Sequence, residues 1–438
     1  MHATTVLHSR FRLRSLALSA GVILLIVIGL AQMDISRVWF AADSESASIF
    51  ADESFGVAPV FVPAEHDVPR LHAREAVLID VDTGIVLYSH GSGEIRSLAS
   101  LTKLVTMYVV LDLVENGTVS LDDRIEPVPE AFWNAMPARS SVLFLGVDQR
   151  VRIETLLLGL SIASGNDAAT ALAYHIDGSV PAFARRMEDV LDELGLTTHS
   201  FVEPSGIDRR NRAGAEDFAR FVAQYLRRFP DAPDRFHTVP TLVFPTVEDY
   251  AGRWNPVSVT HHNRNLLIRE YPDADGLKTG FTYSAGYSLA ASARRGGRRV
   301  AAVVLGVDAP NARIGSRLRT DDAIALLDHA YDAYDVLTPG HPSLEPVRVR
   351  GGEVPTVPVS VVPPEMILPR ADVSHLSGEL QLDSDIRAPV RERQIVGRIV
   401  YRLYGEELAA VPVFSQNEVR ASTGILSLLD RAQAALGM

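Results

Sequence analysis

The sequence predicts an α+β fold in which helices pack on an antiparallel sheet, followed by a small all-β sandwich domain. Two regions of β-type apolar runs, at residues 76–88 and 276–306, flank a central region of helical periodicity. Strands first, helices in the middle, and strands with a helix last are typical of helices on an antiparallel sheet. From residue 344 to 413, short β-type runs alternate with proline and glycine, which favours a separate β domain.

The elements of the first domain are predicted in chain order. Residues 76–81 and 85–88 flank a short glycine-containing turn and form a hairpin. A helix from residue 100 to 115 has almost no polar face, so we expect it to be buried. Further helices are expected at 154–162, 166–176, 181–194, 215–227 and 320–331, and strands at 276–282, 286–293 and 300–306.

The two ends of the chain have a different character. Three arginines precede an apolar run at residues 16–33, which indicates a signal peptide or a single membrane anchor. The expected segments are 1–33 as signal or anchor, 34–70 as a tether, 71–338 as the main domain, 344–414 as the β domain and 415–438 as an amphipathic helix. That last helix would lie on a membrane surface or pack on the β domain.

Composition restricts the class of protein. The chain has 438 residues, a net charge of −12 and no cysteine. The absence of cysteine excludes disulfides, thiolate metal sites and a cysteine nucleophile. Because the chain is acidic and has no long basic run, we expect no nucleic-acid partner.

Only two lysines occur, Lys103 and Lys278, and the other 40 Lys-plus-Arg positions are arginine. Arginine replaces lysine on a surface at little cost, but it cannot replace a lysine that must lose its proton. On a helix, Ser100 and Lys103 project from one face. A lysine with a depressed pKa can take the proton of a serine hydroxyl. A serine cap followed by an exposed lysine has the same spacing, yet the scarcity of lysine favours the chemical interpretation.

Two more motifs follow, Ser164-Gly165-Asn166 between two expected helices and Lys278-Thr279-Gly280 on an expected strand. With Ser100 and Lys103, this order marks the penicillin-recognising serine enzymes. Over residues 76–331 the chain resembles the low-molecular-mass penicillin-binding proteins that act as D-alanyl-D-alanine carboxypeptidases (serine peptidase family S11). Residues 345–413 resemble the accessory β domain of many members.

The resemblance implies an enzyme that trims the terminal D-alanine from peptidoglycan stem peptides ending in D-Ala-D-Ala, through an acyl-enzyme, and that penicillins inhibit. It implies no metal or organic cofactor. The catalytic candidates are Ser100, Lys103, Ser164 and Asn166. The substrate-binding candidates are Lys278, Thr279, Gly280, Phe281 and Arg313. An exposed arginine without a role is the more ordinary interpretation of Arg313.

In these roles Ser100 is the nucleophile and Lys103 accepts its proton. Ser164 relays a proton to the leaving amine, and Asn166 holds Lys103 or the substrate amide. Family analogy places an oxyanion hole at the backbone N–H groups of Ser100 and Phe281. The chain departs from the family at Leu98, where proline is usual, and at Phe281, where histidine or tyrosine is common.

Three alternatives remain open on the sequence. A β-lactamase of the same fold needs a carboxylate to activate the deacylating water, and Glu203 is the one faint candidate. The motifs do not exclude a DD-endopeptidase that cuts crosslinks. A non-catalytic, membrane-tethered cell-wall scaffold is the third. We expect export to the outer (periplasmic) face of a bacterial cytoplasmic membrane.

Overall fold

The structure is a computed structural model that describes residues 58–64, 69–91, 93–125, 136–137, 140–146, 148–250 and 256–423. The contacts divide the chain into residues 1–58 and 59–438, and nearly all described residues belong to the second unit. The expected signal or anchor at 1–33 and most of the tether at 34–70 lie outside the described residues. Within the described part, no helix combines the length and the apolar character that crossing a membrane requires.

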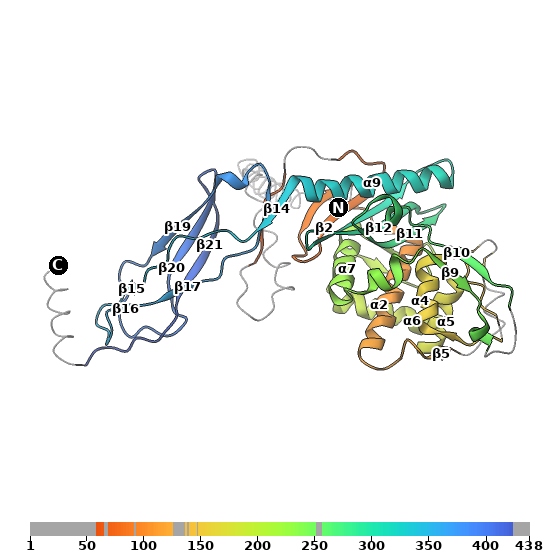
Figure 1. Cartoon of the computed structure of the whole chain (residues 1–438), viewed down its shortest axis with the longest axis horizontal. Coiled ribbons are helices and arrows are strands. Elements are labelled where there is room, and N and C mark those ends of the chain that lie inside the picture. The colour runs from red at the N-terminus through yellow and green to blue at the C-terminus, as the bar shows by residue number, and fades with distance from the viewer. Residues whose placement is uncertain are drawn as a thin grey trace, which may run out of the picture. The chain divides into compact units, whose positions relative to one another are not determined.

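A five-stranded antiparallel sheet organises the first domain (Figure 1), with strand order β11-β12-β13-β2-β3. The expected hairpin and meander are confirmed, and the register pairs Lys278 of β11 with Ala290 of β12. The strands are β2 Glu75–Asp80, β3 Val86–His90, β11 Ala274–Thr282, β12 Gly286–Arg295 and β13 Arg298–Val307. Shorter strands are β4 Arg96–Ser97, β5 Arg124–Ile125, β6 Val151–Arg152, β7 His199–Ser200, β8 Arg212–Ala213, β9 Thr241–Phe244 and β10 Val259–His262.

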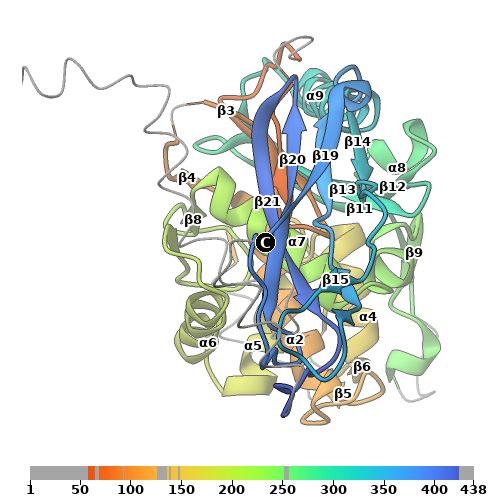
Figure 2. The ribbon, with the colours of Figure 1, turned by 90° about the vertical axis from the view of Figure 1, so that its left-hand side faces the viewer.

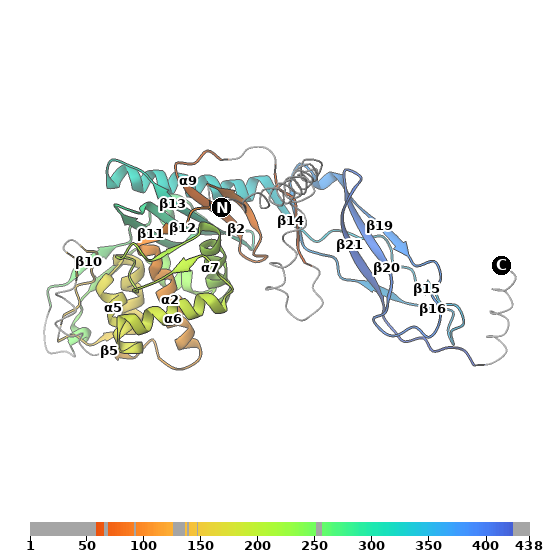
Figure 3. The ribbon, with the colours of Figure 1, turned by 180° about the vertical axis from the view of Figure 1, so that it is seen from behind.

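Helices cover both faces of this sheet, as Figures 1 and 3 show. The helices are α2 Thr102–Glu115, α4 Ile153–Leu158, α5 Asn166–Asp177, α6 Val180–Glu193, α7 Ala215–Arg228, α8 Leu267–Glu270 and α9 Ala312–Ala333. In β13, Val303 belongs to the core shared with α2 and α7, and its neighbour Val304 to the core shared with α9. This alternation follows from the period of two along a strand.

Two expected helices have different limits. The helix expected at 154–162 is α4 followed by a single π-turn, Gly159–Ala163. The last helix begins at Ala312 rather than near residue 320, because the side chain of Asn311 caps it by accepting the N–H of Ile314 at 3.0 Å.

The C-terminal region contains an all-β domain, as expected (Figure 2). Its larger sheet has the order β17-β21-β20-β19, and a two-stranded sheet pairs β15 with β16. These strands are β15 Val347–Arg348, β16 Thr356–Val357, β17 Val359–Val361, β19 Leu376–Leu382, β20 Ile395–Leu403 and β21 Glu406–Ser415.

One strand of this region pairs with the first domain. Strand β18 (Met366–Pro369) lies between β1 (Val60–Phe61) and β14 (Tyr334–Leu337) in a three-stranded sheet. Its Ile367 is fully buried in the core under α9. The expected boundary at 338–344 stays a prediction, and the chain crosses back into the first core beyond it.

The helix expected at 415–438 does not begin where the sequence placed it. Ser415 ends β21, and Val419 exchanges two backbone hydrogen bonds with Val390, at 2.8 and 2.9 Å. Because this pairing buries Val419 in the β domain, residues 415–423 are not helical. Residues 424–438 lie outside the described residues.

Candidate active site

The three sequence motifs come together at one end of α2. Ser100 lies in a 3-10 turn, Ala99–Leu101, and Lys103 in the first turn of α2. The Lys103 ammonium donates to Ser100 Oγ at 3.3 Å and to Asn166 Oδ1 at 2.7 Å. Lys278 Nζ donates to Ser164 Oγ at 3.1 Å. Each lysine therefore donates to a serine hydroxyl, and the contact between Lys278 and Ser164 joins two motifs that lie 114 residues apart.

Lys103 is fully buried. Burial lowers the pKa of Lys103 to about 7, and the carboxylates of Glu203 and Asp167 oppose that shift. A third hydrogen bond runs from Lys103 Nζ to the backbone oxygen of Ser205 at 2.5 Å. The lysine is thus held in place and has a pKa suited to a general base near neutral pH.

Close backbone approach shapes the turn that carries Ser100. A Cβ on Gly206, which has φ +83°, would lie 1.7 Å from the carbonyl oxygen of Ala99. A Cβ on Gly280 of β11 would lie 3.0 Å from the oxygen of Leu98. The backbones of Gly206 and Gly280 therefore lie in close contact with the residues preceding Ser100. At position 206 any residue other than glycine would be strained.

The joint that carries Ser164 and Asn166 has its own irregular geometry. The π-turn Gly159–Ala163 precedes it, a feature frequent at functional sites. Ser164 adopts a left-handed conformation with φ 56°. Helix α5 is preceded by Gly165 and has no side-chain cap, so Asn166 is not the N-cap, and its amide oxygen binds Lys103 instead.

Asp167 ties the same joint to the loop at residues 141–146. Its carboxylate accepts the backbone N–H groups of Leu143, Phe144 and Leu145 at 2.8 to 3.1 Å. Aspartate was not singled out in the sequence, although a carboxylate in the first turn of a helix was visible there.

On β11, Lys278 is buried and Thr279 is half-buried, while Phe281 is 41% exposed. The Phe281 ring stacks on Tyr287, with centroids 4.2 Å apart. Burial lowers the pKa of Lys278 well below its usual value, and the charges of Lys103 and nearby arginines lower it further.

The role of Arg313 in binding a carboxylate stays a prediction. Its side chain is exposed, and among the described residues no hydrogen bond or ion pair joins it to the other candidates. Arg319, on the same helix, is buried and donates to the backbone oxygens of Gly280 (3.0 Å) and Ser288 (3.2 Å). Burial lowers the pKa of Arg319 to about 10.

A buried polar cluster lies beneath Lys278. His237 Nδ1 is 3.2 Å from Ser161 Oγ, and its Nε2 is 2.7 Å from the hydroxyl of Tyr225. Burial and the charge of Lys278 lower the pKa of His237 to about 3, so this histidine is neutral. No motif in the sequence indicated it.

The family model described as D-alanyl-D-alanine carboxypeptidase matches residues 62–309. The chain belongs to the D-alanyl-D-alanine carboxypeptidase family. The resemblance inferred from the motifs is confirmed, and the chain is a serine hydrolase of this family. A second model, penicillin-binding protein 5, C-terminal domain, matches residues 331–421.

One curated relative and two solved structures are similar to the larger part of the chain. D-alanyl-D-alanine carboxypeptidase DacF of Bacillus subtilis is 31% identical, over 82% of this chain and 88% of its own length. Penicillin-binding protein 5 of Haemophilus influenzae is similar in structure, with a TM-score of 0.66 and 28% identity, over 81% of this chain and 99% of that one. Penicillin-binding protein D2 of Listeria monocytogenes, solved with cefotaxime bound, has a TM-score of 0.51 and 26% identity, over 60% of this chain and 98% of that one.

Proposed function

We propose that the chain is a serine D-alanyl-D-alanine carboxypeptidase that releases the terminal D-alanine of peptidoglycan stem peptides through an acyl-enzyme on Ser100. The observation that carries the proposal is the contact of buried Lys103 with Ser100 Oγ at 3.3 Å. A neutral amine there can take the hydroxyl proton as the serine attacks. An arginine at this position could not, because its guanidinium stays protonated.

The reaction then has two halves. Ser100 Oγ attacks the carbonyl carbon between the two D-alanines while Lys103 Nζ takes its proton. The negative oxygen is stabilised by the backbone N–H groups of Ser100 and Phe281. Ser164, which accepts a hydrogen bond from Lys278, relays the proton taken up by Lys103 to the leaving nitrogen, the C–N bond breaks, and D-alanine departs. Water then hydrolyses the ester of Ser100.

A cationic cluster supports recognition of the substrate's terminal carboxylate. The charges of Lys103, Arg319 and Arg264 all lower the pKa of Lys278. A carboxylate that enters beside Lys278 offsets this repulsion and raises that pKa again. Binding of the carboxylate and protonation of Lys278 therefore favour each other, and Thr279 lies next to the lysine to bind the same group.

The contacts of Glu203 argue against the β-lactamase alternative. Each of its carboxylate oxygens accepts hydrogen bonds from the loop that carries it. An oxygen occupied in this way is not available to activate a deacylating water. We therefore expect penicillins to acylate Ser100 and leave it slowly, so that they act as inhibitors.

The test is release of free D-alanine from a peptide that ends in D-Ala-D-Ala. Wild type and the control Ser89→Ala, an exposed serine on β3, should release it, whereas Ser100→Ala should not. Release by Ser100→Ala would refute the proposal. Cleavage of crosslinked dimers without release from the linear peptide would indicate an endopeptidase. If the wild type hydrolyses neither substrate and does not react with penicillin, the non-catalytic scaffold alternative is favoured.

We further propose that the protein is exported and works at the outer face of the cytoplasmic membrane. The support is the sequence of residues 10–33, where arginines precede an uncharged apolar run. The C-terminal tail provides a second membrane contact in this proposal. Protease digestion of intact spheroplasts should degrade the protein, and its resistance until lysis would contradict the proposal.

A further inference from the structure

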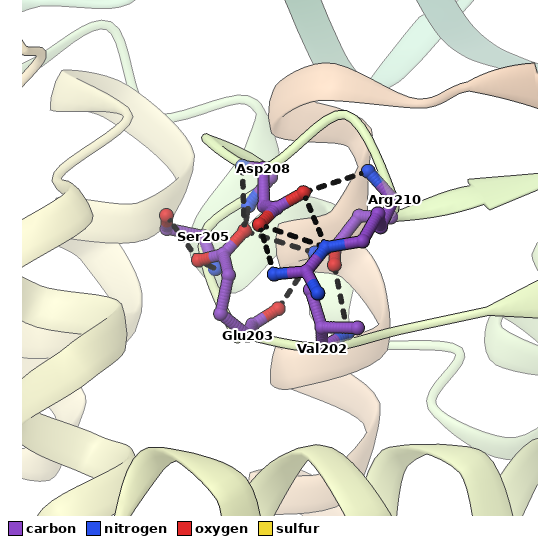
Figure 4. Close-up of polar contacts among 7 residues, drawn as sticks. Val202, Glu203, Ser205, Asp208 and Arg210 are labelled. Atoms are coloured by element: carbon purple, nitrogen blue, oxygen red, sulfur yellow. Dashed lines mark hydrogen bonds and ion pairs between the residues drawn. The ribbon is translucent and has the colours of Figure 1, made fainter.

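The loop at residues 203–211 is held together by one carboxylate, that of Glu203 (Figure 4). Its Oε2 accepts the backbone N–H of Ser205 at 2.7 Å and the Ser205 hydroxyl at 2.5 Å. Its Oε1 accepts the N–H of Gly206 at 2.6 Å and the side-chain amide of Asn211 at 3.0 Å. With a longer contact from the backbone N–H of Asp208 to Oε1 at 3.4 Å, the carboxylate accepts from five donors of its own loop.

The same loop contacts the helix that carries the active-site lysine. The carbonyl oxygen of Ser205 accepts from Lys103 Nζ at 2.5 Å. The carbonyl oxygen of Pro204 accepts from the hydroxyl of Thr106 at 2.7 Å, one turn further along α2. Two successive loop carbonyls thus bind side chains of α2, and the carbonyl of Ser205 binds the amine of Lys103 itself.

Glu203 also acts on Lys103 through its charge. It is the largest favourable charge acting on the ammonium form, ahead of Asp167 on α5. The opposing cation is Arg264, and the charge of Lys103 in turn lowers the pKa of Lys278 on β11. Glu203 differs from the other charged groups because it lies on the loop that also binds the amine of Lys103.

We propose that Glu203 is a positioning residue of the reaction, which holds the Ser205 carbonyl on Lys103 and sets the charge balance around the amine. This inference deepens the proposed carboxypeptidase function and rests on it. It differs from a role as deacylating base, because both oxygens of Glu203 are occupied by loop donors. Glu203 does not touch the reacting atoms and acts through Lys103.

The loop offers a matched control in Asp208. Its carboxylate binds Arg210 through Nη2 at 2.6 Å and the Arg210 backbone N–H at 2.9 Å. Figure 4 shows this pair beside Glu203 in the same loop. Asp208 is not among the charges that act on Lys103. Asp208→Asn removes one negative charge from the loop without changing the contacts of Lys103.

The experiment measures the rate of acylation by a fluorescent penicillin from pH 5 to 9 for wild type, E203Q, E203D and D208N. Acylation needs neutral Lys103, so the rate rises through the pKa of that residue. We call the pH range in which the acylation rate rises the acid limb of the pH profile. Loss of the Glu203 charge lowers the pKa of Lys103, so we expect the acid limb of E203Q to lie on the order of one pH unit below that of wild type. E203D keeps the negative charge, but its shorter side chain weakens the hydrogen bonds to the loop. Its acid limb should therefore stay at the wild-type pH while the acylation rate falls about three- to tenfold.

D208N should keep the wild-type limb and a rate within about twofold of wild type. An E203Q limb at the wild-type pH, or an equal shift in D208N, would overturn the inference. Should E203Q fail to fold, E203D decides: a wild-type rate in that variant overturns it. D-alanine release by the wild type is measured in parallel. A wild type that neither releases D-alanine nor reacts with penicillin would refute the carboxypeptidase function itself, which is a separate outcome.

Discussion

At the scale of single residues, the proposed chemistry depends on an amine kept neutral by burial. Lys103 donates to three acceptors, Ser100 Oγ, Asn166 Oδ1 and the carbonyl oxygen of Ser205, and is fully buried. Desolvation disfavours its charged form, and the carboxylates of Glu203 and Asp167 limit that effect. The balance leaves the amine able both to take and to return a proton near neutral pH.

This balance predicts the pH dependence of the wild type. Below the Lys103 pKa of about 7 the amine is protonated and cannot accept the proton of Ser100. The rate of penicillin acylation should therefore rise with pH through about 7 and level off above it. Stopped-flow acylation with the fluorescent penicillin measures this directly. A rate that is flat or falls between pH 5 and 8 would show that another group is the base.

A second residue-scale prediction concerns Arg319. Replacing it with methionine removes the two hydrogen bonds that its guanidinium donates to the carbonyl oxygens of Gly280 and Ser288. We expect R319M to lower the free energy of unfolding by about 1–3 kcal/mol. R317M, which removes an exposed arginine paired with Glu270 on the same helix, should cost about 0–1 kcal/mol. Urea unfolding of both variants decides, and equal losses would contradict the account.

At the scale of elements, the site depends on segments that approach one another at backbone distance. The turn Ala99–Leu101 lies between the loop at 203–211 and β11. Glycines at 206 and 280 allow this approach, and it places Ser100 where both segments can contact a substrate. The geometry of the nucleophile is therefore set by three segments far apart in the sequence.

Gly206→Ala should disrupt this arrangement. The added Cβ meets the carbonyl oxygen of Ala99 at 1.7 Å, and φ +83° is itself strained for alanine. We expect a loss of about 3 kcal/mol or more of unfolding free energy, with much slower acylation. Gly117→Ala is the control, since φ is +77° there but no atom lies within 4 Å. Its cost should be about 1 kcal/mol, without loss of acylation. Equal behaviour of the two variants would contradict the packing argument.

At the scale of the whole molecule, the first domain is completed by a strand from beyond its expected boundary. Strand β18 pairs with β14, and Ile367 is fully buried with Tyr334. Arg370 adds an ion pair with Asp335 at 3.0 Å. Stability of the first domain therefore depends on residues that the sequence assigned to the β domain.

Ile367→Ala tests this dependence. Removing the buried side chain should lower the free energy of unfolding by about 2–5 kcal/mol. The acylation rate of the folded protein should not change, because Ile367 is not in contact with the site residues. Ile395→Ala, at a position 56% exposed on β20, should change stability by less than about 0.5 kcal/mol. If Ile367→Ala leaves the free energy of unfolding in denaturant unchanged, β18 does not contribute to the stability of the first domain and the account is contradicted.

The sequence was informative where residue type or period carries the signal. The meander and its two lysines were predicted because alternation and the scarcity of lysine are both visible in one dimension. Arg319 could not be predicted, because it is one of 40 arginines and only packing buries it. Arg313 was proposed because it lies a short way past the last strand, and its role in binding a carboxylate stays a prediction. Glu203 was noticed only as a carboxylate, since its five donors come together only in the folded loop.

The most direct measurement is the site of a penicillin adduct in the wild-type protein. Trypsin should release residues 97–103, a peptide with two serines, Ser97 and Ser100. After incubation with penicillin, tandem mass spectrometry should find a long-lived acyl group on Ser100. An adduct on Ser97 or on another peptide would contradict the assignment of the nucleophile. Rapid destruction of the penicillin without any adduct would contradict slow deacylation and favour a β-lactamase.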